Sequence, residues 1–175
     1  MSIEPASMSF SDHTPYPPVK VCGPNPQYAR LMLKNIASYS SEMSAISLYI
    51  YNSVILKSEY PDLADCFLQV SKVEMRHLEI YCQLASLLGA DPRLWSYSGR
   101  KLSYWSPSCN QYPRLTPQII EYAICGEYEA IESYRRQSAW VRDEYIVNNI
   151  NRIILDEERH IEIFHSMLEE LRGVK

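Results

Sequence analysis

The stretch INRIILDEERHIEIFHSMLEEL, residues 150–171, carries apolar side chains at every third or fourth position, which predicts a helix with one buried face. Glu157 and His160 are three residues apart and fall on that face, so their side chains point the same way. An ionised carboxylate buried without a partner is destabilising by several kcal/mol. We therefore expect a compensating group from elsewhere in the chain, and one metal ion can bind both side chains.

A second pair on this helix, Glu162 and His165, has the same spacing. Its neighbours at helical spacing are mostly polar, among them Glu158, Arg159 and Glu169. Such spacing is common on charged helix surfaces. We therefore expect Glu162 and His165 to face solvent rather than a metal.

The bulk properties restrict the class of protein. A chain of 175 residues is long enough for one core and too short for two full domains. Its net charge is −4 and it has no cluster of Lys and Arg, which argues against a nucleic-acid partner. No apolar run approaches the roughly 18 residues of a membrane-spanning helix, and the first residues lack the pattern of a signal peptide. These features predict a cytoplasmic protein with no membrane partner.

The cysteines indicate reduced thiols, because they are odd in number and none forms a Cys-x-x-Cys pair. Cys66, Cys82 and Cys125 fall in expected helices and are interpreted as small buried side chains. Cys22 and Cys109 fall in loops, where they can be reactive or can bridge subunits.

Prolines are concentrated at the start of the chain, where no apolar period is visible. Proline favours extended backbone and excludes a regular helix there. We therefore divide the chain into an extended proline-rich arm, residues 1–26, and a helical unit, residues 27–175. The arm is expected to pack along this unit or along a neighbouring subunit.

The first two helices each bring ionisable groups to an apolar stripe. The first is predicted from Asn25-Pro26 to about Lys57, and Glu42 is the only carboxylate within it. The second is predicted over residues 61–88 and contains Glu74 and His77, which repeat the Glu-x-x-His arrangement on the buried face. Two such pairs favour a metal site over two satisfied core histidines.

The remaining elements complete an all-α fold. Residues 90–115 form a long connection rich in proline and aromatic side chains, expected to pack on the bundle and to carry the chain back along it. A third helix is predicted over residues 116–138, with Glu127 on its apolar stripe, before a turn at residues 140–143 and the fourth helix. We expect a four-helix bundle with a long crossover between helices 2 and 3.

The inward-pointing groups can share one site only if they lie at the same level. Glu42 and Glu74 lie about 16 residues on either side of the first turn, hence about 24 Å from that end of the bundle at 1.5 Å per residue. Glu127 and Glu157 lie about 15 residues on either side of the last turn, hence about 22 Å from the other end. All four levels fall near the middle of helices that are about 42 to 45 Å long.

This arrangement predicts a centre for two metal ions, because about four negative charges in a core are neutralised by two divalent cations. Carboxylate and imidazole ligands without thiolates favour iron or manganese over structural zinc. We predict iron, with manganese as the alternative. The predicted ligands are Glu42, Glu74, His77, Glu127, Glu157 and His160.

The same ligand set resembles that of the ferritin-like di-iron and di-manganese proteins, in which two helices each provide a Glu and two provide Glu-x-x-His. Within that superfamily the chain is most similar to rubrerythrin, over roughly residues 27–172. Ala123-Ile124-Cys125-Gly126-Glu127 looks like the Gly-Glu segment of that group. The resemblance implies that Tyr49 hydrogen-bonds a ligand carboxylate and that Tyr134 is a second such tyrosine. From spacing alone, Tyr49, Tyr81 and Tyr134 can orient carboxylates, pass an electron or act as plain core aromatics.

Two features depart from the rubrerythrin pattern. Rubrerythrins typically carry a second glutamate three residues after the third-helix ligand, for redox-linked ligand exchange, and Ala130 stands there instead. No paired Cys-x-x-Cys follows the bundle, so the rubredoxin module is missing and electrons are expected from a separate protein.

The resemblance implies an oxidoreductase that reduces hydrogen peroxide or dioxygen with an external electron-donor protein. Alternatives remain: peroxide disproportionation as in manganese catalase, ferroxidase activity in iron handling, or a structural protein that uses the metals to fold. We also expect a homo-oligomer, most simply a dimer, because the arm and the crossover provide more apolar surface than one bundle needs.

Overall fold

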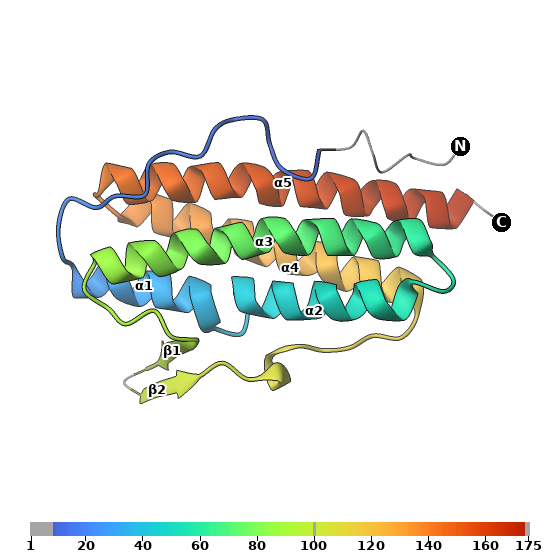
Figure 1. Cartoon of the computed structure of the whole chain (residues 1–175), viewed down its shortest axis with the longest axis horizontal. Coiled ribbons are helices and arrows are strands. Elements are labelled where there is room, and N and C mark those ends of the chain that lie inside the picture. Colours follow the sequence, from blue (N-terminus) through green and yellow to red (C-terminus); the bar gives the residue numbers. More distant parts are fainter. Residues whose placement is uncertain (1–8, 100, 174–175) are drawn as a thin grey trace.

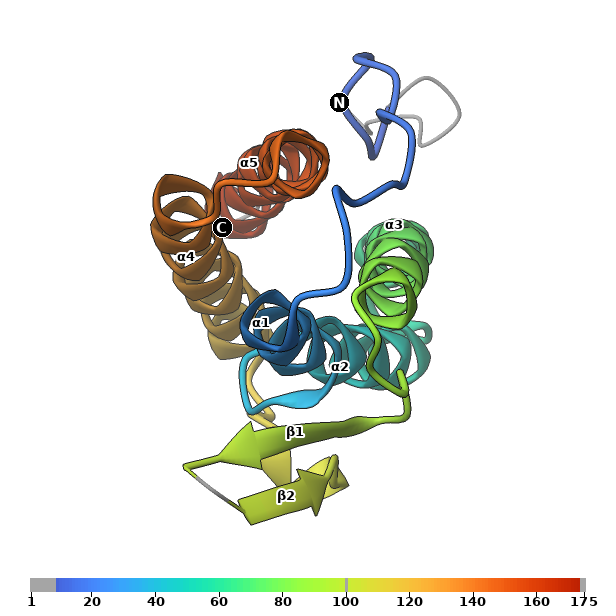
Figure 2. The same cartoon turned by 90° about the vertical axis from the view of Figure 1, so that its left-hand side faces the viewer.

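The computed structural model describes residues 9–99 and 101–173, and its long helices form a bundle (Figure 1). In the end-on view of Figure 2, α3, α4 and α5 surround the bundle axis together with α1 and α2, which follow one another along the same edge. α2 packs on α3, and α4 packs on α5. The predicted four-helix bundle is confirmed. The helices are α1 Pro26–Ala37, α2 Glu42–Leu56, α3 Pro61–Leu87, α4 Thr116–Trp140 and α5 Glu144–Gly173.

Local side-chain chemistry sets several helix ends. The Asn25 side chain accepts hydrogen bonds from the backbone N–H groups of Gln27 and Tyr28 in the first turn of α1, at 3.0 and 3.1 Å. Asp143 does the same for α5, because its Oδ1 accepts from Tyr145 N at 3.1 Å. Beyond the end of α3, Gly89 has a φ of 93°, a left-handed conformation that glycine adopts without a steric penalty.

The prediction of one helix from residue 25 to residue 57 was wrong, because α1 ends at Ala37 and α2 begins at Glu42. The intervening sequence is Ser-Tyr-Ser-Ser, and serine side chains compete with the helix for backbone hydrogen bonds. Ser41 is the N-cap of α2, and its side chain accepts from Ser44 N. The interruption makes Glu42 the first residue of α2, where the helix dipole favours a carboxylate.

The crossover between α3 and α4 contains secondary structure that the sequence analysis did not identify. β1, Trp95–Ser98, pairs antiparallel with β2, Lys101–Tyr104, and a short 3-10 helix, η2, covers Pro107–Cys109. The crossover is fixed to α2, because Trp105 Nε1 donates to Ser44 Oγ at 3.0 Å. The expectation that this segment packs on the bundle is therefore confirmed (Figure 1).

The core is divided into two apolar clusters, one at each end of the bundle. Met32, Ile36, Leu84 and Ile150 belong to the first cluster, and Phe67, Phe164 and Ile120 belong to the second. The stripes predicted from the sequence supply both clusters. The inward-pointing carboxylates lie at the level between them, where the apolar stripes are interrupted by charge.

Of the three cysteines that were expected to be buried in helices, only one is fully buried. Cys66 is buried, but Cys82 is only half-buried and Cys125 is exposed. Cys125 directly precedes Gly126 on α4, and that part of the helix lines a cavity rather than a packed neighbour. The prediction that Cys125 is a small core residue was therefore wrong.

Residues 9–25 contain neither helix nor strand and lie along the outside of the bundle, whereas residues 1–8 lie outside the described part of the chain. Helix α1 begins at Pro26. Within the described residues, no helix is both long enough and apolar enough to cross a membrane.

Candidate metal centre

Six ionisable side chains from α2, α3, α4 and α5 meet in the middle of the bundle. All are almost completely buried, with exposed fractions of 3% or less. They are the predicted set Glu42, Glu74, His77, Glu127, Glu157 and His160, and the structure brings all six together.

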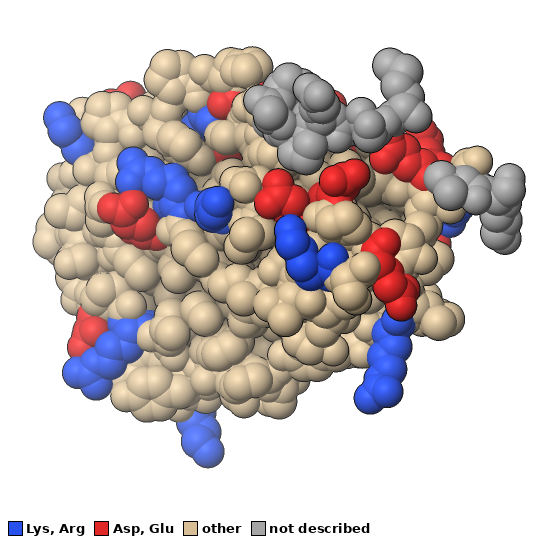
Figure 3. Space-filling model, turned by 45° about the vertical axis from the view of Figure 1, so that its right-hand side comes forward, with Lys and Arg blue, Asp and Glu red and all other residues tan. Residues whose placement is uncertain are grey.

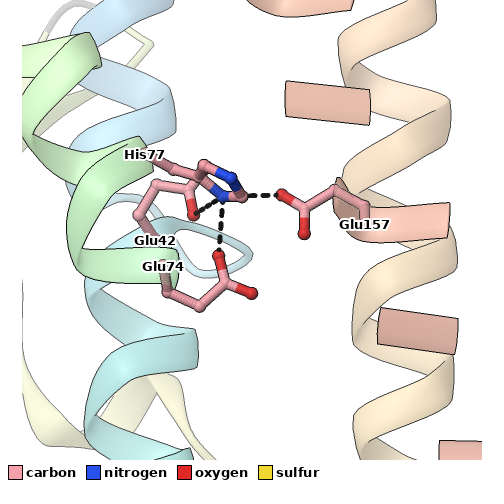
Figure 4. Close-up of side chains that lie close together, drawn as sticks. All are labelled: Glu42, Glu74, His77 and Glu157. Atoms are coloured by element: carbon pink, nitrogen blue, oxygen red, sulfur yellow. Dashed lines mark hydrogen bonds and ion pairs between the residues drawn. The ribbon is translucent and has the colours of Figure 1, made fainter. Parts of the chain in front are cut away.

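The first group of ligand atoms surrounds Nδ1 of His77 (Figure 4). This nitrogen lies 3.0 Å from Glu74 Oε2, 3.3 Å from Glu157 Oε1 and 3.7 Å from Glu42 Oε2. Glu74 and His77 come from one turn of α3, and Glu42 and Glu157 face them from α2 and α5. The four side chains can therefore bind one metal ion.

The second group surrounds Nδ1 of His160 and repeats the first. This nitrogen lies 3.0 Å from Glu74 Oε1, 3.0 Å from Glu157 Oε2 and 3.7 Å from Glu127 Oε1. Glu74 and Glu157 thus direct one oxygen toward each histidine. Both would therefore hold two metal ions together, whereas Glu42 and Glu127 would each hold one.

The donor set fits two divalent cations. In each group the ligand atoms lie within 4.8 Å of one another. Four carboxylates share only two imidazoles, so two divalent ions would offset charge that a core does not otherwise tolerate. Oxygen Oε1 of Glu74 is buried, yet it accepts no hydrogen bond within the described part of the chain. Carboxylate oxygen and imidazole nitrogen suit iron and manganese.

Without metal, the carboxyl groups and histidines share protons. Burial raises the pKa of Glu127 to about 8, and it also raises the pKa of Glu42 well above its ordinary value. Burial opposes the charged form of His77, but Glu157, Asp156 and Glu42 together outweigh it and raise the pKa of this histidine. Metal binding must therefore displace protons from the site.

Two tyrosines donate hydrogen bonds to Glu127 and Glu42, the carboxylates that each lie near only one of the two histidines. The hydroxyl of Tyr49 donates to Glu127 Oε1 at 2.5 Å, and the hydroxyl of Tyr134 donates to Glu42 Oε1. Burial raises the pKa of both hydroxyls well above the ordinary value, so they remain protonated donors. Tyr81 stacks on Tyr134, with ring centroids 5.5 Å apart. Tyr49 and Tyr134 are thus placed to orient one ligand at each metal position.

Replacing Tyr49 by phenylalanine is expected to weaken metal binding at the His160 position by about tenfold, because Glu127 then loses the donor that orients it. A competition titration with a metal chelator measures this affinity. Tyr51→Phe is the matched control, since Tyr51 lies on the same helix but stacks on Tyr112 of the crossover. Equal affinities for the two variants would show that Tyr49 does not position the ligand.

The sequence analysis missed Asp156, which is fully buried beside the centre. Its Oδ2 accepts a hydrogen bond from Nε2 of His77 at 3.0 Å, and its Oδ1 lies 2.8 Å from Arg152 Nη1. Burial disfavours the charged carboxylate, but the interactions with His77, Tyr16 and Arg152 together outweigh it and lower the pKa of Asp156. The available signal was an Arg and an Asp four residues apart at the edge of an apolar stripe.

The second Glu-x-x-His pair on α5 has no part in the cluster. Glu162 and His165 are both exposed, as expected. Glu162 forms an ion pair with Arg159 at 2.8 Å on the helix surface. Helix face, rather than motif spacing, distinguishes the two pairs.

A cavity of about 250 Å³ extends from the surface to the carboxylates. Exposed Tyr39 and Ser40, in the interruption between α1 and α2, line it together with the buried ligands Glu42 and Glu127. A Cβ added at Gly126 would meet no atom within 4 Å, so the α4 side of the cavity is open. Small molecules therefore have room to reach the centre.

Comparisons with known proteins agree with this geometry. The family model for rubrerythrin matches residues 36–168. The probable manganese catalase of Clostridium acetobutylicum is 25% identical over 89% of this chain and 76% of its own length.

Two solved structures share the fold. A manganese catalase from Anabaena superposes with a TM-score of 0.81 at 20% identity, covering 94% of this chain and 81% of its own. Mycobacterium tuberculosis bacterioferritin has a TM-score of 0.71 at 21% identity, covering 87% of this chain and 90% of its own.

Proposed function

The chain belongs to the rubrerythrin family, and from this premise we propose that it is a di-metal oxidoreductase that reduces hydrogen peroxide, or dioxygen, with electrons from a separate donor protein. We propose that two iron ions, or two manganese ions, are held by the six buried carboxylates and histidines. The observation that carries the proposal is that Glu74 and Glu157 each direct one oxygen toward each of the two histidines, at the end of an accessible cavity.

When bound, two adjacent redox-active metals supply the electrons that cleave an O–O bond. The protein's own residues set the conditions for that chemistry. Glu74 and Glu157 hold the two positions at a short separation, and the two apolar core clusters limit access of water from the ends of the bundle. Tyr49 and Tyr134 keep Glu127 and Glu42 in place during the reaction.

We propose that the substrate enters through the cavity between α2 and α4. Ala130, which is half-buried, lines this cavity where the rubrerythrin pattern has a glutamate. Its methyl group leaves room beside Glu127 and offers no carboxylate to replace a histidine ligand. The ligand set is therefore expected to stay the same in the oxidised and reduced states.

Peroxide consumption by metal-analysed protein tests the function. In the proposed reaction, hydrogen peroxide takes up two electrons and two protons and gives two water molecules, so turnover requires a reductant. We expect consumption to depend on an added reduced electron carrier, with no release of dioxygen. Metal-loaded protein that consumes no peroxide with any reductant would contradict the proposal and would favour a metal-stabilised structural role.

A second candidate is peroxide disproportionation, in which one peroxide is oxidised to dioxygen while another is reduced to water. The manganese catalase relative, which matches most of this chain, favours this candidate. A fixed ligand set also suits it, because a second peroxide closes the cycle without a donor. Release of dioxygen without reductant by the manganese-loaded protein would establish it, and oxidation of added ferrous iron by dioxygen would point to a ferroxidase.

We propose that the chain forms a homo-oligomer, most simply a dimer. Several large apolar side chains are exposed, including Val54 at 70% and Leu115 at 61%. On the face shown in Figure 3, charged side chains occur singly or in small mixed groups between broad uncharged areas. Light scattering would refute the proposal by giving the 20.3 kDa mass of one chain at micromolar concentration.

A further inference from the structure

The N-terminal arm, residues 9–25, runs along α5 on the side of the bundle where α5 and α3 lie (Figures 1 and 2). Its backbone is tied to α5 at several points. Arg159 Nε donates to the carbonyl of Ser9 at 3.1 Å, and Asn149 Nδ2 donates to the carbonyl of Pro18 at 3.2 Å. The arm is therefore a fixed part of the bundle surface over this span.

The arm also reaches Asp156, the carboxylate that holds the outer nitrogen of His77. Asp156 Oδ1 accepts from Ser11 Oγ at 2.8 Å and from Asp12 N at 2.7 Å. Asp156 Oδ2 accepts from the hydroxyl of Tyr16 as well as from His77 Nε2. Three of the donors to this buried carboxylate thus come from the arm, and both oxygens depend on it.

Arg152 closes the same network from the side of α5. Its side chain is 4% exposed, and its Nη2 donates to the carbonyl of Asp12 at 2.9 Å and to Ser11 Oγ at 3.1 Å. Its guanidinium lies 4.2 Å from the ring centroid of Tyr16. The guanidinium therefore contacts both Asp156 and the arm residues that bind Asp156.

The two metal positions differ in whether the outer nitrogen of their histidine has a hydrogen-bond partner. Nε2 of His160 is buried and has no hydrogen-bond partner among the described residues. Asp156 directly precedes Glu157 in the chain, and the residue that precedes Glu74 on α3 is Val73. The pair Glu157/His160 therefore follows a carboxylate, and the pair Glu74/His77 does not. Within the described residues, Asp156 binds the outer nitrogen of His77 across the bundle, and the outer nitrogen of His160 has no such partner.

We propose that the N-terminal arm contributes to the metal centre by orienting His77 through Asp156. As a result, the His77 position binds its metal first and more tightly than the His160 position. The proposal rests on the proposed six-residue ligand set. Ser11, Asp12 and Tyr16 are positioning residues, because they hydrogen-bond Asp156; the ring of Tyr16 also lies edge-on to the ring of His77, with centroids 6.4 Å apart.

The physical reason is preorganisation. A hydrogen bond from Nε2–H to Asp156 selects the histidine tautomer whose Nδ1 lone pair faces the other ligands, and it fixes the ring plane. Loss of such a partner typically lowers metal affinity by about 10- to 100-fold. Asp156 can hold His77 only while its own oxygens stay oriented, and the arm supplies that orientation. His160 must instead be ordered by the metal itself.

Stepwise binding of Mn²⁺ to the metal-free full chain tests this proposal. Calorimetry resolves the two binding steps, and electron paramagnetic resonance separates an isolated Mn²⁺ ion from a coupled pair. For the wild type we expect the first step to be at least about tenfold tighter than the second. One equivalent of Mn²⁺ should then give mainly the signal of the isolated ion.

Variants of the protein identify which binding step belongs to the His77 position and which to the His160 position. Tyr16→Phe and Ser11→Ala are expected to weaken the first step severalfold, and Asp156→Asn by about 10- to 100-fold, with the second step little changed. Tyr49→Phe, which affects Glu127, should weaken only the second step.

Equal affinities of the two steps in the wild type would overturn the proposal, and so would arm variants that leave the first step unchanged. Equal weakening of both steps by Tyr16→Phe would also overturn it, because that pattern indicates general loosening of the bundle. Lys20→Ala is the control, since Lys20 is an exposed residue of the arm and is not among the donors to Asp156. The titration needs no turnover, so ordered binding without peroxide consumption would reject the proposed function alone.

Discussion

Replacing Glu157 by alanine is expected to remove both metal ions from the protein. Glu157 places one oxygen 3.3 Å from the His77 nitrogen and the other 3.0 Å from the His160 nitrogen. Its loss therefore takes a ligand from both positions and also removes a negative charge that two cations share. Glu127→Ala, in contrast, takes a ligand from the His160 position only and is expected to leave about one metal per chain.

Metal analysis after dialysis against a weak chelator measures this outcome. Glu162→Ala is the matched control, because Glu162 lies on the same helix, has the same Glu-x-x-His spacing and faces solvent. The control is expected to retain two metals per chain. If Glu162→Ala loses as much metal as Glu157→Ala, the assignment of the inward helix face is wrong.

Removing the metals is expected to make stability depend strongly on pH, with metal-free protein becoming less stable as the pH rises from about 5 to about 8. Folding raises the pKa of Glu127 from 4.5 to about 8, and burial raises that of Glu42 as well. Between these pH values the folded state binds more protons than the unfolded state, so the free energy of unfolding falls as the pH rises.

The other ionisable groups of the centre are consistent with a free energy of unfolding that falls as the pH rises. The pKa values of His77 and His160 are raised in the folded state, so their contribution is complete at low pH and is lost as the pH rises. Burial disfavours the charged form of Glu74, but the two histidines, His160 and His77, together outweigh it and lower the pKa. The contribution of Glu74 is present above the unfolded pKa and is lost in acid, outside this window.

Metal ions reverse the trend because they displace the same protons and bind more tightly as the pH rises. The difference in Tm between metal-loaded and metal-free protein is therefore expected to widen across this range. Each 1 kcal/mol corresponds to about 2–4 °C for a chain of this size. Calorimetric scans at several pH values measure the difference, with Glu162→Ala as the control variant. A constant difference would show that the buried carboxyl groups do not hold protons in the metal-free state.

Periodicity was sufficient to predict the bundle and the inward groups. A carboxylate that interrupts an apolar stripe has few stable environments, so Glu74, Glu127 and Glu157 could be placed in the core from their spacing alone. Counting residues from the turns then placed them at one level, because the rise of a helix is constant. The same reasoning separated Glu157 from Glu162, since the two differ in helix face.

Two features of the fold, the interruption before Glu42 and the β-hairpin of the crossover, could not be predicted from periodicity. The interruption before Glu42 depends on serine side chains that satisfy the backbone locally, and helix propensity alone does not report it. The β-hairpin of the crossover forms only where a cross-strand partner and the surface of the bundle are available.

The orientation of Glu74 and Glu157 toward both histidines, and the contact of the arm with Asp156, were decided only by the tertiary structure. Periodicity determines which way a side chain points from its own helix, but it does not determine which oxygen faces which histidine across the bundle. Asp156 is bound by residues more than 130 positions earlier in the chain. A hydrogen bond between such distant positions depends on how the chain packs in three dimensions, and local sequence carries no signal for it.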